Sequence, residues 1–274
     1  MGDDNINKRI LSYIFFDITH PTPYLIKTYL EFFKDKLLSK TYSTPDLSSE
    51  SLHWKRFYHQ CSLESPNEVI LQRGTQTKDS VLFTLKRLRE EIQGDIHCLD
   101  VGCGPTSQFY TIQLENDERI QVISVDPLAE VYKELHRKYE TDYDIECVVG
   151  YGEKLCELFP EKQFHLIYTQ NAMDHSQNPI EFFKNCYNVI KSGGYLILHG
   201  FIKEGTAAHW LGLHKWDIEV NGDDLLLTDK QKNYNRFNIT KDYDLKLVYK
   251  KITGNNIGDM YTFIYKKTSM KVEV

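Results

Sequence analysis

An aspartate followed by two glycines is the part of this 274-residue chain whose residue types best suit ligand binding. The segment HCLDVGCGPTS, residues 97–107, begins as a short apolar run and places Asp100 just before Gly102 and Gly104. Glycines let the backbone approach a ligand closely, and a following helix offers free N–H groups. A carboxylate this close to the turn attracts a positive group and repels a pyrophosphate. The segment therefore predicts a pocket for a ligand that carries an ammonium group.

Polar side chains also follow the apolar run at 164–169. Asn171, Asp174 and His175 come directly after it. Because ligands of open α/β sheets bind at the carboxyl ends of the strands, these side chains are expected to face the pocket. His175 has the ordinary pKa range of a general base, and the alternative is that it only packs and hydrogen-bonds locally.

Two more histidines are candidates for the same edge. His199 ends the apolar run at 194–199, and His214 lies in HWLGLHKW, residues 209–216. That segment is expected to pass over the pocket as a lid, and the alternative for it is an amphipathic surface helix. Several histidines and an aspartate raise a metal option. Magnesium sites, however, are rich in oxygen, and the spacing matches no compact zinc pattern, so no metal is expected.

Short apolar runs alternate with helical segments from about residue 95 onward. The runs lie at 97–101, 120–125, 145–149, 164–169 and 194–199. This alternation is typical of βαβ units, which form a parallel sheet with helices on both faces. Two later runs, 246–252 and 259–268, are joined by a short turn rich in glycine and asparagine and predict an antiparallel pair. The expected fold class is therefore α/β, Rossmann-like and mostly parallel.

The chain is expected to divide into a cap and a core. Residues 1–74 read as a helical cap, with apolar residues at helical spacing over 24–38. Residues 75–274 read as the core domain, which begins with an amphipathic helix over 78–92. A lid insertion is expected at about 203–240 of this domain.

The segment LDVGCGPTS resembles motif I of the class I S-adenosylmethionine-dependent methyltransferases. Four later pieces are similar to successive motifs of that family, in order: IQVISVDPLAEVY (120–132), IECVVGYGEKL (145–155), FHLIYTQNAMDHSQNP (164–179) and NVIKSGGYLILHGF (188–201). The resemblance covers about residues 75–268. It implies a seven-stranded sheet whose last two strands form an antiparallel hairpin. NAMDH (171–175) and GLHKW (212–216) are similar to the NALDH and GLHQW segments of a small-molecule subgroup.

The resemblance also implies how S-adenosylmethionine is held. Asp126 would bind the ribose, since a carboxylate accepts two hydroxyl hydrogen bonds. Many relatives carry an aspartate where this chain has Tyr151, so the Gly152 backbone and the Glu153 side chain are expected to take over the adenine contact. Arg73 would hold the methionine carboxylate by a forked pair. The full set of expected cofactor-binding residues is Arg73, Asp100, Gly102, Gly104, Asp126, Pro127, Gly152, Glu153 and Asn171.

The expected activity is transfer of a methyl group to oxygen or nitrogen of a small polar metabolite, with S-adenosylhomocysteine as the product. A sugar, a nucleotide-linked sugar or a phosphorylated compound would suit the histidine-rich rim. The expected catalytic residues are Asp174, His175, His199 and His214. The alternatives are a methyltransferase for tRNA or protein, a cofactor-binding protein without transfer activity, and a nicotinamide oxidoreductase. Ser107 and Pro105 depart from the glycine pattern of that last class.

The composition of the chain limits the binding partners and the cellular compartment that we expect. The formal net charge is −6 and no basic stretch stands out, so no nucleic-acid partner is expected. No apolar run reaches the roughly 18 residues of a membrane span, and the polar start has no signal-peptide core. The six cysteines are scattered without a CxxC pair, which favours a reducing compartment, and the cytoplasm is the expected location. The sequence leaves the oligomeric state open.

Overall fold

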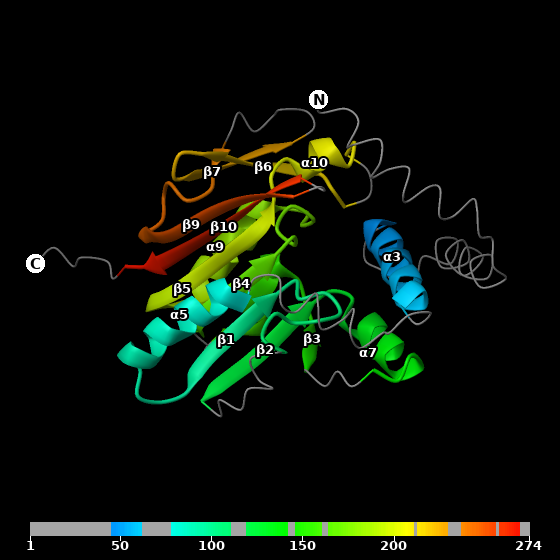
Figure 1. The fold of residues 1–274 in the computed structure, drawn as a ribbon, viewed down its shortest axis with the longest axis horizontal. Coiled ribbons are helices and arrows are strands. Elements are labelled where there is room, and N and C mark those ends of the chain that lie inside the picture. The colour runs from blue at the N-terminus through cyan, green and yellow to red at the C-terminus, as the bar shows by residue number, and fades with distance from the viewer. Residues whose placement is uncertain are drawn as a thin grey trace, which may run out of the picture.

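The structure is a computed structural model, and it describes residues 45–61, 78–110, 119–141, 146–160, 164–210, 213–229, 237–255 and 258–268. Seven of its strands form one twisted sheet in the order β3-β2-β1-β4-β5-β10-β9 (Figure 1). The parallel strands are β1 (Ile96–Val101), β2 (Ile120–Asp126), β3 (Cys147–Val149), β4 (Phe164–Gln170) and β5 (Ile190–Phe201). The remaining pair, β9 (Leu245–Asn255) and β10 (Gly258–Lys267), runs antiparallel, as the sequence predicts.

Helices cover both faces of this sheet because the central strands are apolar on both sides. Leu85 of α5 (Lys78–Glu91) packs on one face with Cys98 of β1. Phe182 of α9 (Pro179–Val189) packs on the other face with Leu99, the next residue of the same strand. Successive side chains of a strand point to opposite faces, so continuous apolar runs are what a sheet covered on both sides requires.

Helix α9 begins at a well-formed N-cap. The Asn178 side chain accepts hydrogen bonds from the backbone N–H groups of Ile180 and Glu181, both at 3.2 Å. Pro179 occupies the first turn, where its missing N–H costs nothing. This cap matters to the site because it fixes where the segment after β4 ends.

Replacing Asn178 with alanine is expected to lower the free energy of unfolding by about 1 kcal/mol, because two N–H groups of the first turn lose their acceptor. Urea denaturation followed by circular dichroism measures the change. Asn178→Asp is the matched control, since aspartate caps helices equally well. An equal loss in both variants would contradict the capping role.

The expected lid insertion contains a short helix and a second, smaller sheet. Its elements are α10 (Glu204–Ala207), β6 (Trp216–Asn221), β7 (Asp224–Asp229) and β8 (Phe237–Asn238), and the three strands are antiparallel in the order β6-β7-β8. Trp216 and Leu227 pack into the same core cluster as α9. The Trp216 indole N–H also donates to the Ser176 carbonyl at 3.0 Å, which ties the insertion to the segment after β4.

The described part of the expected cap is helix α3 (Pro45–Cys61), while the helix expected over 24–38 lies outside the described residues. Trp54 and Tyr58 of α3 pack with Leu128 and with Tyr132 of α7 (Ala129–Lys138). Figure 1 shows α3 beside α7, at the end of the sheet formed by β2 and β3. None of the helices in the described ranges is long and apolar enough to cross a membrane.

Candidate active site

A cavity of about 590 Å³ lies at the carboxyl ends of the parallel strands, between α3, the loops that follow β1 to β4, and α10. Most of the residues expected to bind the cofactor or acceptor line it: Asp100, Gly102, Gly104, Asp126, Pro127, Gly152, Glu153, Asn171, His175 and His214. Asp174 is adjacent to His175 but is not among the lining residues. Arg73 lies outside the described residues.

The glycine turn after β1 is fixed by its backbone conformation and by close packing. Gly102 and Gly104 have φ angles of +68° and +63°, in the left-handed region that favours glycine. A Cβ at Gly102 would overlap the Cβ of Ala172 in the loop after β4. A Cβ at Gly104 would lie 3.7 Å from the Trp54 ring, so α3 covers this turn directly. The glycines therefore serve packing as well as ligand approach.

Asp100 is a buried carboxylate at the end of β1, with an exposed fraction of 1%. Its Oδ2 accepts hydrogen bonds from the Ser107 hydroxyl at 2.6 Å and the Gln108 backbone N–H at 3.1 Å. Burial raises the pKa of Asp100 to about 7, although these two hydrogen bonds oppose the rise. Burial removes the water that would stabilise the charged form of Asp100. A cationic group placed beside Asp100 would stabilise that form instead.

Asp126 holds a similar position at the end of β2. Its Oδ2 accepts from the Gly104 backbone N–H at 3.0 Å, and its Oδ1 accepts from the Leu128 N–H at 2.8 Å. Burial raises the pKa of Asp126 to about 6, against the effect of these hydrogen bonds. Each carboxylate oxygen has a second lone pair, so Asp126 can still accept hydroxyl groups from a ligand.

The region expected to hold adenine differs from expectation in one respect. The Glu153 Oε1 accepts the backbone N–H groups of Gln177 and Asn178, at 2.8 and 3.3 Å. The Glu153 carboxylate therefore fixes the loop before α9, and an adenine contact by its side chain stays a prediction. Gly152 has no room for a side chain, because a Cβ there would overlap the Phe182 ring.

Asn171 connects the ends of two central strands. Its side-chain oxygen accepts the backbone N–H of Phe201, the last residue of β5, at 3.1 Å. Its own backbone N–H donates to the His199 carbonyl at 3.0 Å. Asn171 has a φ of +47°, so the chain turns sharply here and carries Asp174 and His175 into place.

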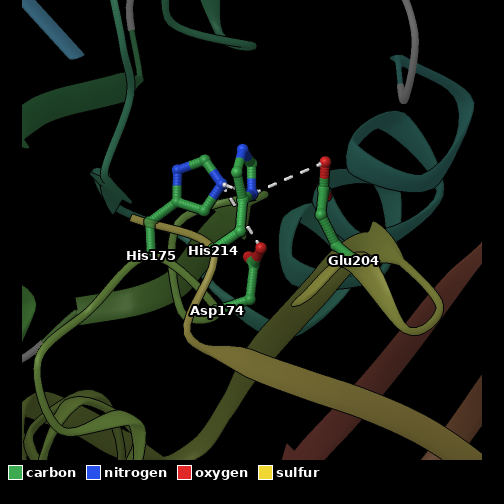
Figure 2. Close-up of side chains that lie close together, drawn as sticks. All are labelled: Asp174, His175, Glu204 and His214. Atoms are coloured by element: carbon green, nitrogen blue, oxygen red, sulfur yellow. Dashed lines mark hydrogen bonds and ion pairs between the residues drawn. The ribbon is translucent and has the colours of Figure 1, made fainter. Parts of the chain in front are cut away.

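Four titratable side chains meet at the α10 end of the cavity. Figure 2 shows Asp174 and His175 from the segment after β4 facing Glu204 and His214 from the insertion. His175 Nε2 lies 2.9 Å from His214 Nδ1 and 3.3 Å from Asp174 Oδ2, and His214 Nδ1 lies 3.8 Å from Glu204 Oε1. We call Asp174, His175, Glu204 and His214 the acceptor-end cluster. The structure thus brings together three of the expected catalytic residues and adds Glu204.

The acceptor-end cluster is largely withdrawn from solvent. The exposed fractions of Asp174 and Glu204 are 4% and 7%. Burial raises the pKa of Asp174, and the neighbouring His175 opposes that rise. Burial acts to lower the pKa of His175, but nearby carboxylates, Asp174 foremost, outweigh it and raise the pKa above its ordinary value.

The placement expected for His199 is wrong. Strand β5 continues two residues further, to Phe201, and it is Phe201 that lines the cavity. His199 shares a hydrogen bond of 2.8 Å between its Nδ1 and the Thr262 hydroxyl on β10, and burial lowers its pKa to about 4. His199 therefore joins two strands below the cavity instead of facing it.

Helix α3 contributes lining residues that the sequence did not single out. Leu47, Glu50, His53 and Trp54 all face the cavity, and the Trp54 indole donates to Glu50 Oε1 at 2.8 Å. The only signal in the sequence was the aromatic character of LHWKRFYH, residues 52–59. Such composition does not say which face of the helix meets the core.

The lining is strongly acidic. It contains Glu50, Asp100, Asp126, Glu153 and Glu204, and the described lining residues include no lysine or arginine. A cavity lined by one sign of charge favours a ligand of the opposite sign. This charge suits a ligand with a sulfonium and an ammonium group and disfavours the pyrophosphate of a nicotinamide dinucleotide.

The sheet order with its reversed β10 and the acid–glycine turn at its switch point define the class I, S-adenosylmethionine-dependent methyltransferase fold. Residues 99–198 match the family model described as a methyltransferase domain. S-adenosylmethionine is the cofactor of this class.

A curated relative is 27-O-demethylrifamycin SV methyltransferase of Amycolatopsis mediterranei, 24% identical over 104 residues. That match spans 38% of this chain and 38% of the relative's own length. Among solved structures, the chain is similar to the N-methyltransferase NodS from Bradyrhizobium japonicum in complex with S-adenosylhomocysteine. The identity is 11% and the TM-score 0.46, with 72% of this chain and 87% of the other covered. The chain is also similar to an S-adenosylmethionine-dependent methyltransferase from Clostridium acetobutylicum. The identity is 15% and the TM-score 0.47, with 79% of this chain and 99% of the other covered.

Proposed function

We propose that the chain transfers a methyl group from S-adenosylmethionine to an oxygen or nitrogen atom of a small polar molecule. The observation that carries this proposal is one cavity with two chemically distinct ends. Asp100 and Asp126 stand at the end formed by β1 and β2, and the acceptor-end cluster stands at the other. Methyl transfer is an in-line displacement, so two facing binding ends are its main requirement.

The cofactor end would hold S-adenosylmethionine through complementary groups. Asp100 would bind the methionine ammonium and Asp126 the ribose hydroxyls, while the turn at Gly102 and Gly104 lets the backbone approach. The remaining cofactor contacts that we propose are Pro127, Gly152, Glu153 and Asn171, which line the cavity, and Arg73.

The acceptor would lie against the acceptor-end cluster. A hydroxyl or a protonated amine must lose its proton to become a nucleophile, and His175, backed by Asp174 and next to His214, is placed to handle that proton. The acidic lining favours an uncharged or cationic acceptor over a phosphorylated one. The name of the rifamycin relative, a small-molecule methyltransferase, supports an acceptor of that size.

We further propose that α3 and the insertion at about 203–240 act as the lids of this cavity, because residues of both line it. Closure of this kind excludes water and suits a small acceptor better than a nucleic acid. The net charge of −6 supports the same choice. We place the protein in the cytoplasm, supported by the free thiols of Cys98, Cys103, Cys147, Cys156 and Cys186.

Calorimetric titration of the purified chain with S-adenosylhomocysteine, with NAD as the control, tests this function. We expect one equivalent of S-adenosylhomocysteine to bind and NAD to give no heat. Release of S-adenosylhomocysteine from S-adenosylmethionine is then measured against a panel of small alcohols and amines. Binding of NAD alone would overturn the cofactor assignment. Cofactor binding without turnover on any panel member, or on tRNA, would leave a binding protein as the better description.

A further inference from the structure

We propose that Asp174, His175, Glu204 and His214 bind one divalent cation of the Zn²⁺ type at the acceptor end of the cavity. The binding itself stands on the geometry of the acceptor-end cluster. Its role in the reaction rests on the proposed function.

The donor atoms lie near the separations that a shared cation needs. One nitrogen or oxygen from each of the four side chains can be chosen so that all lie within 4.8 Å of one another. Ligands at about 2.0–2.1 Å from zinc stand about 3.3 Å apart in a tetrahedral site. The separation of His175 Nε2 and Asp174 Oδ2 is 3.3 Å, and the two histidine nitrogens, at 2.9 Å, need only a small widening.

The orientation of the two imidazoles is compatible with a metal site. Their rings are almost perpendicular, with centroids 4.4 Å apart, and a ring nitrogen of each faces the other (Figure 2). Without a cation, one of the facing nitrogens must carry the hydrogen that the other accepts. With a cation between them, both nitrogens present lone pairs to it, which is how neutral histidine ligates metals.

The charge of the acceptor-end cluster also favours a bound cation. Asp174 and Glu204 are two buried carboxylates, and buried charges are normally paired or coordinate a metal. While the hydrogen bond between His175 and His214 is kept, the pair carries at most one positive charge. A divalent cation balances both carboxylates and leaves both histidines neutral.

Asp174 supplies an independent indication. Its Oδ2 is buried and accepts no hydrogen bond from the described residues. The atom points into the cluster, where His175 Nε2 is 3.3 Å away. An aspartate oxygen that is buried without a hydrogen bond and lies beside an imidazole nitrogen has the surroundings of a metal ligand.

The donor set selects the kind of cation. Magnesium and calcium take mainly oxygen ligands, whereas two imidazoles with two carboxylates suit zinc and its neighbours in the first transition series. The pattern was hidden in the sequence because the ligands come from two separate segments, 174–175 and 204–214, instead of one compact motif.

A cation here would activate the acceptor. His175, Glu204 and His214 line the cavity, so the acceptor hydroxyl could join the four protein ligands as a fifth, an expansion that zinc allows. With the cation bound, His175 would serve as a ligand instead of a base, and the bound hydroxyl would lose its proton to solvent more readily, since metal coordination lowers its pKa. Its oxygen then attacks the methyl carbon. The C–O bond forms as the S–C bond breaks, and the electron pair of that bond returns to sulfur.

Titration of the metal-stripped full chain with Co²⁺, followed by visible absorption, and then displacement by Zn²⁺, tests the site. We expect one equivalent of Co²⁺ with the intensified bands of a low-coordinate site, and stoichiometric displacement. His214→Gln and Asp174→Asn should each weaken Co²⁺ binding at least about 100-fold. His209→Ala, at an exposed histidine of the same segment, is the matched control and should bind as the wild type does.

Calorimetry with S-adenosylhomocysteine shows whether each variant is folded, because that ligand is assigned to the other end of the cavity. Glu204→Gln, close to glutamate in shape, replaces any variant that fails this check. Wild-type chain that binds no Co²⁺, or folded cluster variants that bind it as tightly as wild type, would overturn the inference. Binding of S-adenosylhomocysteine without Co²⁺ would leave the proposed function intact, and binding of Co²⁺ without S-adenosylhomocysteine would leave the metal site and remove the function.

Discussion

Replacing Asp126 with alanine is expected to weaken the binding of S-adenosylhomocysteine at least about 100-fold. In the proposed complex the change removes two hydrogen bonds that the ribose hydroxyls donate to the carboxylate, and hydrogen bonds to charged groups contribute about 1.5–3 kcal/mol each. The carboxylate also holds the N–H groups of Gly104 and Leu128, so the glycine turn loses its anchor as well. Calorimetric titration measures the loss directly.

Two further variants separate the ribose contact from general effects of charge. Asp126→Asn keeps one acceptor oxygen and is expected to retain part of the affinity. Glu130→Ala removes an exposed carboxylate from α7, paired only at the surface with Lys133, and should leave the affinity unchanged. A folded Asp126→Ala chain whose dissociation constant stays within about threefold of wild type would contradict the assignment of the ribose to Asp126.

Binding of S-adenosylhomocysteine near pH 7 is expected to release protons, up to about half a proton per site from Asp100. Its pKa of about 7 in the free protein means that half the molecules carry a proton there, and an adjacent ammonium lowers the pKa. Because the free state binds more protons than the complex, affinity should rise with pH up to about 7 and level off above it. Titration in two buffers of different ionisation enthalpy counts the protons.

Asp100→Asn should abolish most of this proton release and weaken binding about tenfold to 100-fold, since the ammonium loses a charged partner. The same variant should be more stable than wild type at high pH. The pKa of Asp100 in the folded chain, about 7, lies above the value of 3.8 for a free side chain. The free-energy cost of burying the ionised carboxylate therefore grows from about pH 4 to about pH 7, and the wild type loses stability over that range. Asp95→Asn, at an exposed aspartate just before β1, is the control. Proton release that persists in Asp100→Asn would assign it to another group.

The sheet was predictable because its signals are local. Strands β1, β2 and β4 are short apolar runs that end at or just before a polar residue, and burial on both faces makes each run continuous. Asp100 and Asp126 end or nearly end such runs, so strand position alone brings both to the edge that binds ligands. The antiparallel partners β9 and β10 followed from the short turn between them.

The acceptor end was only partly predictable, because tertiary packing decides it. Glu204 belongs to a four-residue helix, and nothing in EGTA marks that glutamate as different from any exposed one. It reaches the site because β6 packs against the core and Trp216 fixes the segment that bears Asp174. His199 was misplaced for a related reason. An apolar run shows where a strand lies, but the strand can continue past it, and Phe201 takes the edge.

The contact between Gly102 and Ala172 sets how far apart the two ends of the cavity lie. The turn after β1 and the loop after β4 approach as closely as two small residues allow, since a Cβ on Gly102 would overlap Ala172. In the proposed reaction the first segment carries the methyl donor and the second carries the acceptor, and reacting atoms must come within about 3–3.5 Å. These two residues thus set how closely the segment with the methyl donor can approach the segment with the acceptor. A larger side chain at either position would lengthen that path.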